Sequence, residues 1–460
     1  MKKFEVGDLY YNDERYQELC ALNQISGYER SLNPADIILP PGYKAEVFME
    51  GLDSPSDMLF INETTMLIAD SGLSSGNGKV YRLQNGELAL LAENFYPPLN
   101  GIAYRNGNTY VSHRGFITVV RENGTREDII SGLPSYGDFS NNNIVFGPDN
   151  KIYFGIGTAT NSGVVGLDNT WIYNYPMFHD YPGGFILLSG QNFATRNAFS
   201  SGEEIVYTGA FSPYGIPNMP FELRKGITKA TGCILRANPD GTDLEQVAWG
   251  LRNPARIRFD PTNQLFAANH GFDYRGSRPI VNSPDELHNI LENMWYGWPD
   301  YTAGEPVTLP RFTPSGRAPS EFLLTNHPNV VPRPFAIFPP QSTIMGFDFN
   351  RFETFGNIGD IYIAEFGRSE LQSEEDPTPY SGAGHRVSKV DIITRGVTTF
   401  AINRSGFPAA ITREGGFGRP VEVQFGPDGA MYILDMGTNL PDQLDFFIPN
   451  TGVIWRITPT

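Results

Sequence analysis

Several polar side chains stand at the starts of β-rich segments that recur along the chain, and their types suit the binding of an anion. Arg252 and Asn253 begin one such segment, and Arg419 begins another. Two guanidiniums at one place form an anion-binding spot, because arginine presents a fixed fork of donors to carboxylates. Pairing of each arginine with a neighbouring carboxylate is the open alternative. The same position in other segments is taken by Asn100, Asp138 and Asn141–Asn143.

The histidines indicate neither a zinc site nor a serine hydrolase. His270 in NHGFD and His113 in SHRG stand singly, without the HxH or HExxH spacing of zinc ligands, and no GxSxG occurs. Calcium suits the sequence better, because Gly271, Phe272 and Asp273 form a turn whose carbonyl and carboxylate oxygens are hard ligands. An ordinary turn without a metal is the alternative.

Composition excludes several classes of partner. The 460 residues carry a formal net charge of −17, which argues against nucleic acid and anionic membrane surfaces as partners. No apolar run reaches membrane-spanning length. The two cysteines, Cys20 and Cys233, lie in no CxxC pattern, so no thiolate metal site is predicted.

The start of the chain, MKKFEVGDLYYNDERYQEL, has two lysines but no apolar region. We therefore expect no signal peptide in the sequence as it stands. This leaves the compartment open between the cytoplasm and, if a leader is missing, the periplasm or the exterior.

The elements that must position these residues are repeated. Gly137–Gly157, GDFSNNNIVFGPDNKIYFGIG, predicts two strands around a Gly-Pro-Asp-Asn turn. Similar units start near residues 54, 97, 137, 252, 341 and 418, and most are followed by a third strand of aliphatic, aromatic and basic residues, such as Lys79–Leu83.

Six copies of a small antiparallel sheet predict an all-β protein, a six-bladed β-propeller, with two unrelated β domains as the alternative. We expect Lys44–Glu50 to close the ring by pairing with Val453–Ile457 in the last blade. The propeller then spans residues 41–460. Residues 1–40 form an extension packed on the ring, with a short helix around Asp13–Leu22. Insertions at about 159–231 and 301–339 are expected to be long ordered loops over one face.

The sequence resembles a known family. GLRNPARIRFDP, NHGFD and PDELHNILENMWYGWPDY are similar to the core of the glucose/sorbosone dehydrogenases that depend on pyrroloquinoline quinone (PQQ), in particular the L-sorbosone dehydrogenase-like branch. The resemblance covers about residues 38–458. It implies a six-bladed propeller that oxidises the anomeric or aldehyde carbon of a sugar with PQQ and calcium, after which an electron acceptor reoxidises the PQQ.

Carried over by position, the resemblance implies roles for several residues. Arg252 and Asn253 would face the quinone, and Arg419 would contact its carboxylates. Gly271 and Phe272 would lend backbone carbonyls to calcium. Asn100, from the start of the second blade, joins this group as a cofactor-binding candidate.

One position departs from the family. The general base expected at the start of the third blade is a histidine, and this chain has Phe139 there. Phenylalanine accepts no proton, whereas hydride transfer from a sugar needs a group that takes the hydroxyl proton. Asp138 is adjacent, and His113 or His270 can reach in from neighbouring blades, so these three are the catalytic candidates.

Three functions therefore remain open. The first is a sugar or aldose dehydrogenase-like oxidoreductase with PQQ and calcium, acting on a small sugar or aldehyde. The second is a non-catalytic propeller that binds glycans or a protein, since the aromatic stretches Trp171–Tyr181 and Trp295–Tyr301 can stack on sugars. The third is a metal-dependent lactonase, which needs several oxygen ligands at the channel centre; the candidates are Asn100, Asn141 and Asn253.

Overall fold

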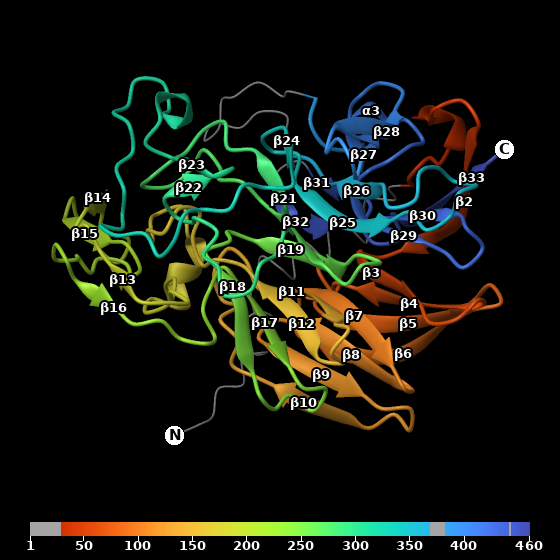
Figure 1. Cartoon of the computed structure of the whole chain (residues 1–460), viewed down its shortest axis with the longest axis horizontal. Coiled ribbons are helices and arrows are strands. Elements are labelled where there is room, and N and C mark those ends of the chain that lie inside the picture. Colours follow the sequence, from red (N-terminus) through yellow and green to blue (C-terminus); the bar gives the residue numbers. More distant parts are fainter. Residues whose placement is uncertain (1–28, 369–381, 441–442) are drawn as a thin grey trace.

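The chain folds into a six-bladed β-propeller, which confirms the fold predicted from the repeats (Figure 1). The computed structural model describes residues 29–368, 382–440 and 443–460. The helix expected around Asp13–Leu22 lies outside these ranges. Within them, no helix is long and apolar enough to cross a membrane.

Each blade is one antiparallel sheet. Blade one contains β3 (Pro55–Phe60), β4 (Thr65–Asp70), β5 (Gly78–Gln84) and β6 (Glu87–Phe95). Blade two contains β7 (Leu99–Arg105), β8 (Asn108–His113), β9 (Phe116–Val120) and β10 (Arg126–Ile130). Blade three contains β11 (Asn141–Phe146), β12 (Ile152–Ile156), β17 (Cys233–Ala237) and β18 (Glu245–Trp249).

The second half of the ring has the same plan. Blade four contains β19 (Pro254–Phe259), β20 (Leu265–Asn269), β21 (Asp285–Asn289) and β24 (Ala336–Phe338). Blade five contains β25 (Ile344–Phe349), β26 (Ile361–Glu365), β27 (Arg386–Val390) and β28 (Val397–Asn403). Blade six contains β29 (Pro420–Phe425), β30 (Met431–Asp435), β33 (Gly452–Pro459) and β2 (Tyr43–Leu52).

The ring is closed by the first long strand of the chain, as predicted. β2 pairs antiparallel with β33, so that Lys44 faces Thr458 and Glu50 faces Val453. The repeats did not indicate β1 (Ile37–Ile38), which adds a fifth strand to blade five by pairing with β28. Both terminal strands cover edges that would otherwise be open to pairing with another chain.

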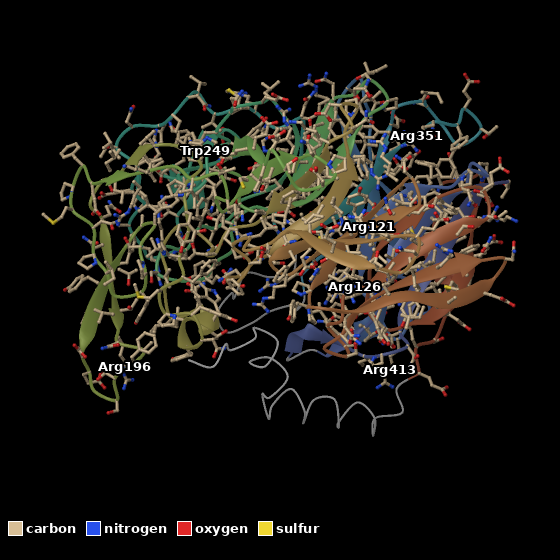
Figure 2. All side chains as sticks on the ribbon, turned by 90° about the horizontal axis from the view of Figure 1, so that it is seen from below. Arg121, Arg126, Arg196, Trp249, Arg351 and Arg413 are labelled. Carbon is tan, nitrogen blue, oxygen red and sulfur yellow. The ribbon has the colours of Figure 1, made fainter. Side chains whose placement is uncertain are left out.

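The two insertions contain short hairpins rather than loops alone. The first includes β13 (Ile186–Leu187), β14 (Asn192–Arg196), β15 (Ile205–Gly209) and β16 (Leu223–Arg224). Figure 2 shows Arg196 near the end of an arm that projects from the ring. Residues in β14 alternate between exposed and half-buried, the pattern of a strand with one packed face. The remaining elements are β22 (Tyr301–Thr302), β23 (Glu305–Pro306), β31 (Asn439–Leu440), β32 (Gln443–Phe447), α3 (Ala409–Thr412) and the 3₁₀ turns Pro34–Asp36, Thr170–Tyr173 and Pro310–Phe312.

The first strands of the blades meet around the channel (Figure 1), and the third residue of each of these strands holds the equivalent position in every blade. Two of these residues are glycines beside larger neighbours. A Cβ atom on Gly346 would lie 2.6 Å from Glu422 Cα, and one on Gly101 would lie 2.9 Å from Asn143 Cβ. The six residues at this position are Asp57, Gly101, Asn143, Arg256, Gly346 and Glu422.

The channel is filled by buried charge. Glu422 forms ion pairs with Arg256 (3.2 Å) and Arg258 (3.0 Å), and Arg258 also faces Asp348 at 3.6 Å. Burial raises the pKa of Glu422, while the two arginines oppose this shift. This hub joins blades four, five and six through Arg256, Asp348 and Glu422, which are buried, and Arg258, which is partly exposed.

Side chains also join the inner strands edge to edge. Asp57 accepts a hydrogen bond from the backbone N–H of Ile102 (2.9 Å), which links blades one and two. Asn143 exchanges two hydrogen bonds with the backbone of Ile257 (2.9 and 3.1 Å), which links blades three and four. Comparable bonds run from Phe425 N–H to Asp348 (2.9 Å) and from Phe60 N–H to Gln424 (3.0 Å).

The close approach at Gly346 gives a direct test of this packing. We expect Gly346→Ala to lower the free energy of unfolding by about 1–3 kcal/mol, the usual cost of overpacking, because the new methyl group meets backbone that cannot turn away. Chemical denaturation measures the change. Gly202→Ala is the matched control, since its Cβ would meet no atom closer than 3.6 Å. Equal stability of the two variants would contradict the packing described.

Candidate functional site

The segment before β11 brings Phe139 to the channel end where the inner strands begin. The backbone N–H groups of Asp138 and Phe139 donate to two carbonyl groups just past β12 (3.0 and 3.2 Å), so the segment continues the β11–β12 pairing. The ring of Phe139 lies 6.3 Å from the ring of His270 and 4.8 Å from Cζ of Arg252. The position expected to hold a base is therefore an aromatic surface against a guanidinium.

Arg252 is held by four hydrogen bonds within the protein. Its Nη1 donates to the Gly271 carbonyl (2.6 Å), and its Nη2 pairs with Asp273 (2.5 Å). Nε and Nη2 also donate to the carbonyl and side-chain oxygens of Asn161 (3.2 and 3.0 Å). The guanidinium is almost fully buried, so it is fixed in place and already has a carboxylate partner.

Asp138 belongs to an adjacent ion-pair network. Its Oδ2 pairs with Arg275 (2.5 Å), and its Oδ1 accepts hydrogen bonds from Asn169 and Trp171 (2.9 Å each). Arg275 also pairs with Asp168 at 2.8 Å. Both carboxylate oxygens of Asp138 are thus engaged, although the side chain adjoins Phe139 and keeps 11% of its surface exposed.

His270 lies beside Phe139 with both ring nitrogens occupied. Nε2 is 2.9 Å from the Ile344 carbonyl, which can only accept, so Nε2 carries the proton. Nδ1 then accepts from the side-chain amide of Asn253 (3.1 Å). Burial, with the charge of Arg252 second, lowers the pKa of His270 to about 4, so the ring is neutral at neutral pH.

The structure does not bring His113 to this place. It ends β8 and packs between blades one and two, where its ring lies 5.1 Å from the ring of Phe95 and is stacked on Phe116 at 5.4 Å. Its Nε2 bonds to the Thr118 hydroxyl (2.7 Å), which itself donates to Asp128 (2.6 Å). Burial, with a smaller contribution from Arg126, lowers the pKa of His113 to about 3.

The asparagines named from the repeats connect neighbouring inner strands. The side-chain oxygen of Asn253 accepts from Asn142 (2.8 Å), and Asn142 also donates to the Pro254 carbonyl (3.0 Å). Asn100 donates to the Asn141 carbonyl (2.9 Å). These contacts fix the start of β11 against β7 and β19.

Arg419 occupies a second cluster, built by blades five and six. Its Nη1 donates to the Arg368 carbonyl (2.6 Å), and its Nε donates to Asn439 (3.0 Å). The guanidinium lies over the ring of Phe366 at 5.0 Å, and the backbone N–H bonds to Asp435 (2.8 Å). Arg419 is almost fully buried, so it is a fixed cation like Arg252.

The turn proposed for calcium is bonded within the protein. The Gly271 carbonyl accepts from Arg252, and the backbone N–H groups of Gly271 and Phe272 donate to Asp285 (2.7 Å) and Ser283 (2.8 Å). Calcium at this turn would have to replace the guanidinium as the partner of the carbonyl. Among the described residues, no group of three or more His, Cys, Asp and Glu side chains is placed to hold a metal.

Two residues that the sequence did not single out hold the LRNP motif. The side-chain oxygen of Asn269 accepts from the backbone N–H groups of Arg252 and Asn253 (3.0 Å each). Asn269 in turn donates to Glu286 (3.3 Å), which is also bonded to His288 (2.6 Å). The DEL motif, which was noted only as part of the family resemblance, lies in β21. Through Glu286 and Asn269 this strand positions the backbone of the LRNP motif.

Asp180 anchors the first insertion behind Phe139, and no pattern in the sequence indicated it. Its carboxylate accepts from the backbone N–H of Ala159 (2.7 Å) and the hydroxyls of Thr160 (2.5 Å) and Thr231 (2.8 Å). These residues are the two ends of the insertion. Burial raises the pKa of Asp180 to about 6, and the three hydrogen bonds oppose the shift.

No family model matches the chain. The quinoprotein glucose dehydrogenase B of Acinetobacter calcoaceticus is 26% identical over 175 residues, which make up 38% of this chain and 28% of the relative. The chain thus matches less than a third of the length of that curated relative.

Solved structures match over nearly the whole chain. The soluble aldose sugar dehydrogenase of Escherichia coli, in the apo form, is 14% identical with a TM-score of 0.52, over 91% of this chain and 100% of that one. The PQQ-bound aldose sugar dehydrogenase of Streptomyces coelicolor is 16% identical with a TM-score of 0.51, over 92% and 100%. The holo PQQ domain of pyranose dehydrogenase from Coprinopsis cinerea is 13% identical with a TM-score of 0.57, over 92% and 97%.

At these identities the solved structures show a shared fold, and the curated match adds likeness in sequence. The resemblance to the PQQ-dependent sugar dehydrogenases is therefore confirmed. The narrower likeness to the sorbosone branch stays a prediction, as do the roles of the individual site residues.

The buried carboxyl group of Asp180 predicts a pH dependence. Because its folded pKa of about 6 lies above the ordinary value of 3.8, its stabilising contribution is complete below about pH 4 and is lost as the pH rises through 6. Relative to Asp180→Asn, the free energy of unfolding of the unmodified protein should fall by up to about 3 kcal/mol across this window. Denaturant unfolding at a series of pH values measures the difference. A constant difference would contradict the prediction.

Proposed function

We propose that this protein is a sugar dehydrogenase-like oxidoreductase that uses PQQ. The observation that carries the proposal is the pair Arg252–Asn253, held beside the Gly271–Phe272 turn at the channel end, in a chain whose sequence is similar to a quinoprotein glucose dehydrogenase. The substrate is a small sugar or aldehyde, and a separate electron acceptor completes the cycle.

The chemistry of the donors suits the cofactor. PQQ carries three carboxylates, and the two buried guanidiniums Arg252 and Arg419 are fixed cations in a protein with a net charge of −17. PQQ would supply the acceptor for the hydride of the substrate carbon. Arg252 and Asn253 would orient the quinone, and Arg419 would hold a carboxylate.

Calcium belongs to the same proposal. Its ligands would be the Gly271 and Phe272 carbonyls. This requires Arg252 to exchange its hydrogen bond to Gly271 for one to the cofactor.

The proton of the substrate hydroxyl needs an acceptor of this chain. Of the three candidates, Asp138 adjoins Phe139 and keeps part of its surface exposed, so we assign it this role. It would have to release one of its bonds to Arg275, Asn169 or Trp171 to accept the proton. His270 would need to give up Asn253, and His113 lies within blade two.

A second function is favoured by Phe139. A phenyl ring packed on Arg252 offers a surface for binding but no proton acceptor. A propeller that binds a glycan or a protein partner without turnover would retain this surface. Such a protein would bind its ligand equally well with and without PQQ, which separates the two functions.

The assignment of the arginines is tested by titrating the purified protein with PQQ, with and without calcium, and following absorbance. Arg252→Lys and Arg419→Lys should each weaken PQQ binding by at least about tenfold, because hydrogen bonds to charged groups contribute about 1.5–3 kcal/mol. Arg196→Lys, at an exposed position on the arm, is the control and should bind PQQ as the unmodified protein does. Unchanged affinity in both of the first two variants would overturn the assignment.

The role of position 139 is tested by restoring a base. Phe139→His places an imidazole beside Arg252, whose charge keeps the ring unprotonated at neutral pH and able to accept a proton. Asp138, the base assigned to the unmodified protein, must first release a hydrogen bond, so we expect dye reduction with an aldose panel to rise, by at most the roughly 10²–10⁴-fold that a general base contributes. Phe139→Leu, which adds no acceptor, is the control. Equal rates for the histidine and leucine variants would show that an imidazole at position 139 does not improve on Asp138 as the base.

A further inference from the structure

Two carboxylates from different parts of the chain share the guanidinium of Arg275 beside Phe139. Its Nη2 pairs with Asp138 Oδ2 (2.5 Å), from the segment before β11, and its Nη1 pairs with Asp168 Oδ2 (2.8 Å), from the first insertion. The side chains of Asp138 and Asp168 are only 11% and 10% exposed. Charge in this cluster is therefore balanced mainly by protein groups rather than by water.

The backbone that carries Arg275, between β20 and β21, is fixed next to the cluster. The side chain of Asn161 donates to the carbonyl groups of Asp273 (2.8 Å) and Arg275 (3.1 Å). A Cβ atom on Gly276 would lie 2.8 Å from Asp168 Oδ2. The loop thus lies directly against the Asp168 carboxylate.

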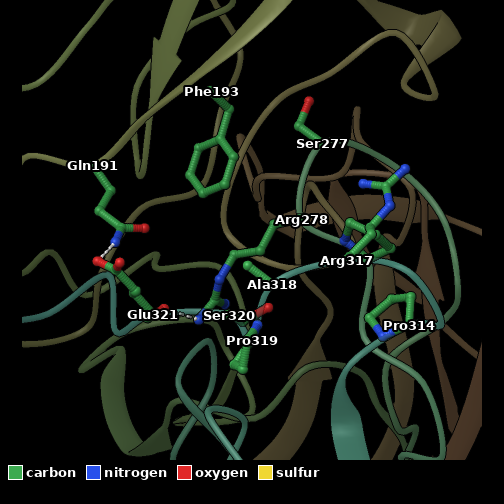
Figure 3. Close-up of a pocket in the computed structure, with 11 residues that line it drawn as sticks. Gln191, Phe193, Ser277, Arg278, Pro314, Arg317, Ala318, Pro319, Ser320 and Glu321 are labelled. Atoms are coloured by element: carbon green, nitrogen blue, oxygen red, sulfur yellow. Dashed lines mark hydrogen bonds between the residues drawn. The ribbon is translucent and has the colours of Figure 1, made fainter. Parts of the chain in front are cut away.

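The same loop is anchored again three residues further on. Arg278 reaches from it to the second insertion (Figure 3), where its Nη2 donates to Asp300 (3.0 Å) and to the Glu321 carbonyl (2.8 Å). Its Nη1 donates to the Pro299 carbonyl (2.7 Å). With its backbone held on both sides, Arg275 can change partners by turning its side chain, without a movement of the loop.

The cluster has one more carboxylate than it has guanidiniums. Asp273 also belongs to it, since its Oδ2 pairs with Arg252 (2.5 Å) and lies 3.5 Å from Nε of Arg275. Three carboxylates thus face two arginines, and uptake of one proton would leave each arginine with one carboxylate. Because unbalanced charge away from water is costly, the cluster is suited to accept one proton.

Asp168 is the carboxylate that can keep Arg275 if Asp138 takes this proton. Its Oδ1 is buried and accepts no hydrogen bond from another residue that the structure describes. This oxygen can receive the Nη2 group that leaves Asp138, which would complete a two-pronged arginine–carboxylate pair. Burial raises the pKa of Asp168, Arg275 opposes this shift, and the negative charge of Asp138 adds to it.

The other titratable groups nearby have partners of their own. The charge of Asp138 adds to the raised pKa of Asp180, but the Asp180 carboxylate is occupied by its bonds to the two ends of the insertion. His270 is occupied by Asn253 and by the Ile344 carbonyl. Exchange of partners in the cluster therefore concerns Asp138, Asp168 and Arg275.

We propose that Asp168 is a positioning residue, which holds Arg275 while Asp138 accepts the proton of a substrate hydroxyl. The inference rests on the function proposed for the channel end. The O–H bond of the substrate breaks, its proton passes to Asp138 Oδ2, and Nη2 of Arg275 turns to Asp168. The substrate carbon gives up its hydride to PQQ and becomes a carbonyl carbon, and Asp138 later releases the proton to water.

A double-mutant cycle, measured without PQQ, tests whether the two carboxylates share Arg275. Asp138→Asn and Asp168→Asn each leave the arginine one carboxylate, whereas the double variant leaves it the 3.5 Å contact with Asp273. We expect the double variant to lower the urea midpoint of unfolding by more than the sum of the single changes. Adding Arg275→Gln to the double variant should raise the midpoint again, because it removes the unpaired charge. An additive cycle, or no rescue by Arg275→Gln, would overturn the proposal.

Proton uptake at Asp138 is followed by carbon-13 NMR of the full-length protein labelled at its aspartate carboxyl groups, also without PQQ. The Asp138 resonance is the one missing from Asp138→Asn. In Asp168→Asn the charge of Arg275 favours the Asp138 carboxylate without competition, so we expect its titration midpoint to fall by at least about one pH unit. Asp168→Glu should restore the midpoint. Glu203→Gln, which removes an exposed carboxylate 3.6 Å from Arg196 on the same insertion, is the control and should leave it unchanged. An unchanged midpoint in Asp168→Asn would refute the role of Asp168.

Catalysis separates this role from the proposed function. In protein loaded with PQQ and calcium, Asp168→Asn should lower kcat for dye reduction by at least about tenfold with little change in KM. The acid limb of its pH profile should move to lower pH, as in the NMR titration. A lower kcat with an unchanged pH profile would indicate a structural effect and count against the proposal. Absence of dye reduction in the unmodified protein would contradict the oxidoreductase function, while the cycle and the NMR titration would still decide the role of Asp168.

Discussion

Buried charge at the centre of the ring is the constraint on which the rest of the fold depends. The buried carboxyl groups of Glu422 and Asp348 face the guanidiniums of Arg256 and Arg258, and the buried Asp57 bonds to the backbone of the next blade. Removal of one partner from such a group leaves an uncompensated charge in a medium that solvates it poorly. The blades therefore have one arrangement in which all these groups are paired, and the two glycines of the inner strands make room for it.

At the channel end, too, a buried charged group is paired within the protein, but its partners come from loops. Arg252 is fixed by Asn161 and Asp273, which come from loops outside the repeats, and its backbone is fixed by Asn269. A guanidinium that is oriented before a ligand arrives loses little freedom on binding. The same bonds must be partly exchanged when an anion takes their place, so the network both prepares the site and competes with its ligand.

The parts of this structure that could be read from the sequence are those that repeat. Turns such as Gly147-Pro148-Asp149, together with the third strands, predicted six blades. The last repeat lacked a fourth strand, which indicated that Lys44–Glu50 completes that blade. The third strand of blade four, which carries Glu286, was not recognised, because its motif resembled a family signature and an insertion separates it from β24. The residues at the inner strand starts were located correctly along the chain.

Their hydrogen-bond partners could not be read in the same way. Asp138 pairs with Arg275, 137 positions away, through a loop of another blade, and Asp180 acts on both ends of its own insertion. Contacts of this kind arise from how two irregular segments fold over each other, and no periodicity records them. This is why position in a repeat predicted proximity to the channel but not whether a side chain is free to react.

Closure of the ring by β2 and β33 also sets the order in which the protein can be completed. β2 precedes blade one in the chain, whereas its pairing partner β33 follows all the other strands of the ring. Until β33 has been made, β2 has no neighbour in its own sheet, and the edges of β2 and β30 are open to other chains. The ring therefore closes only after β33 has been made, because β33 is the link between β30 and β2 in blade six.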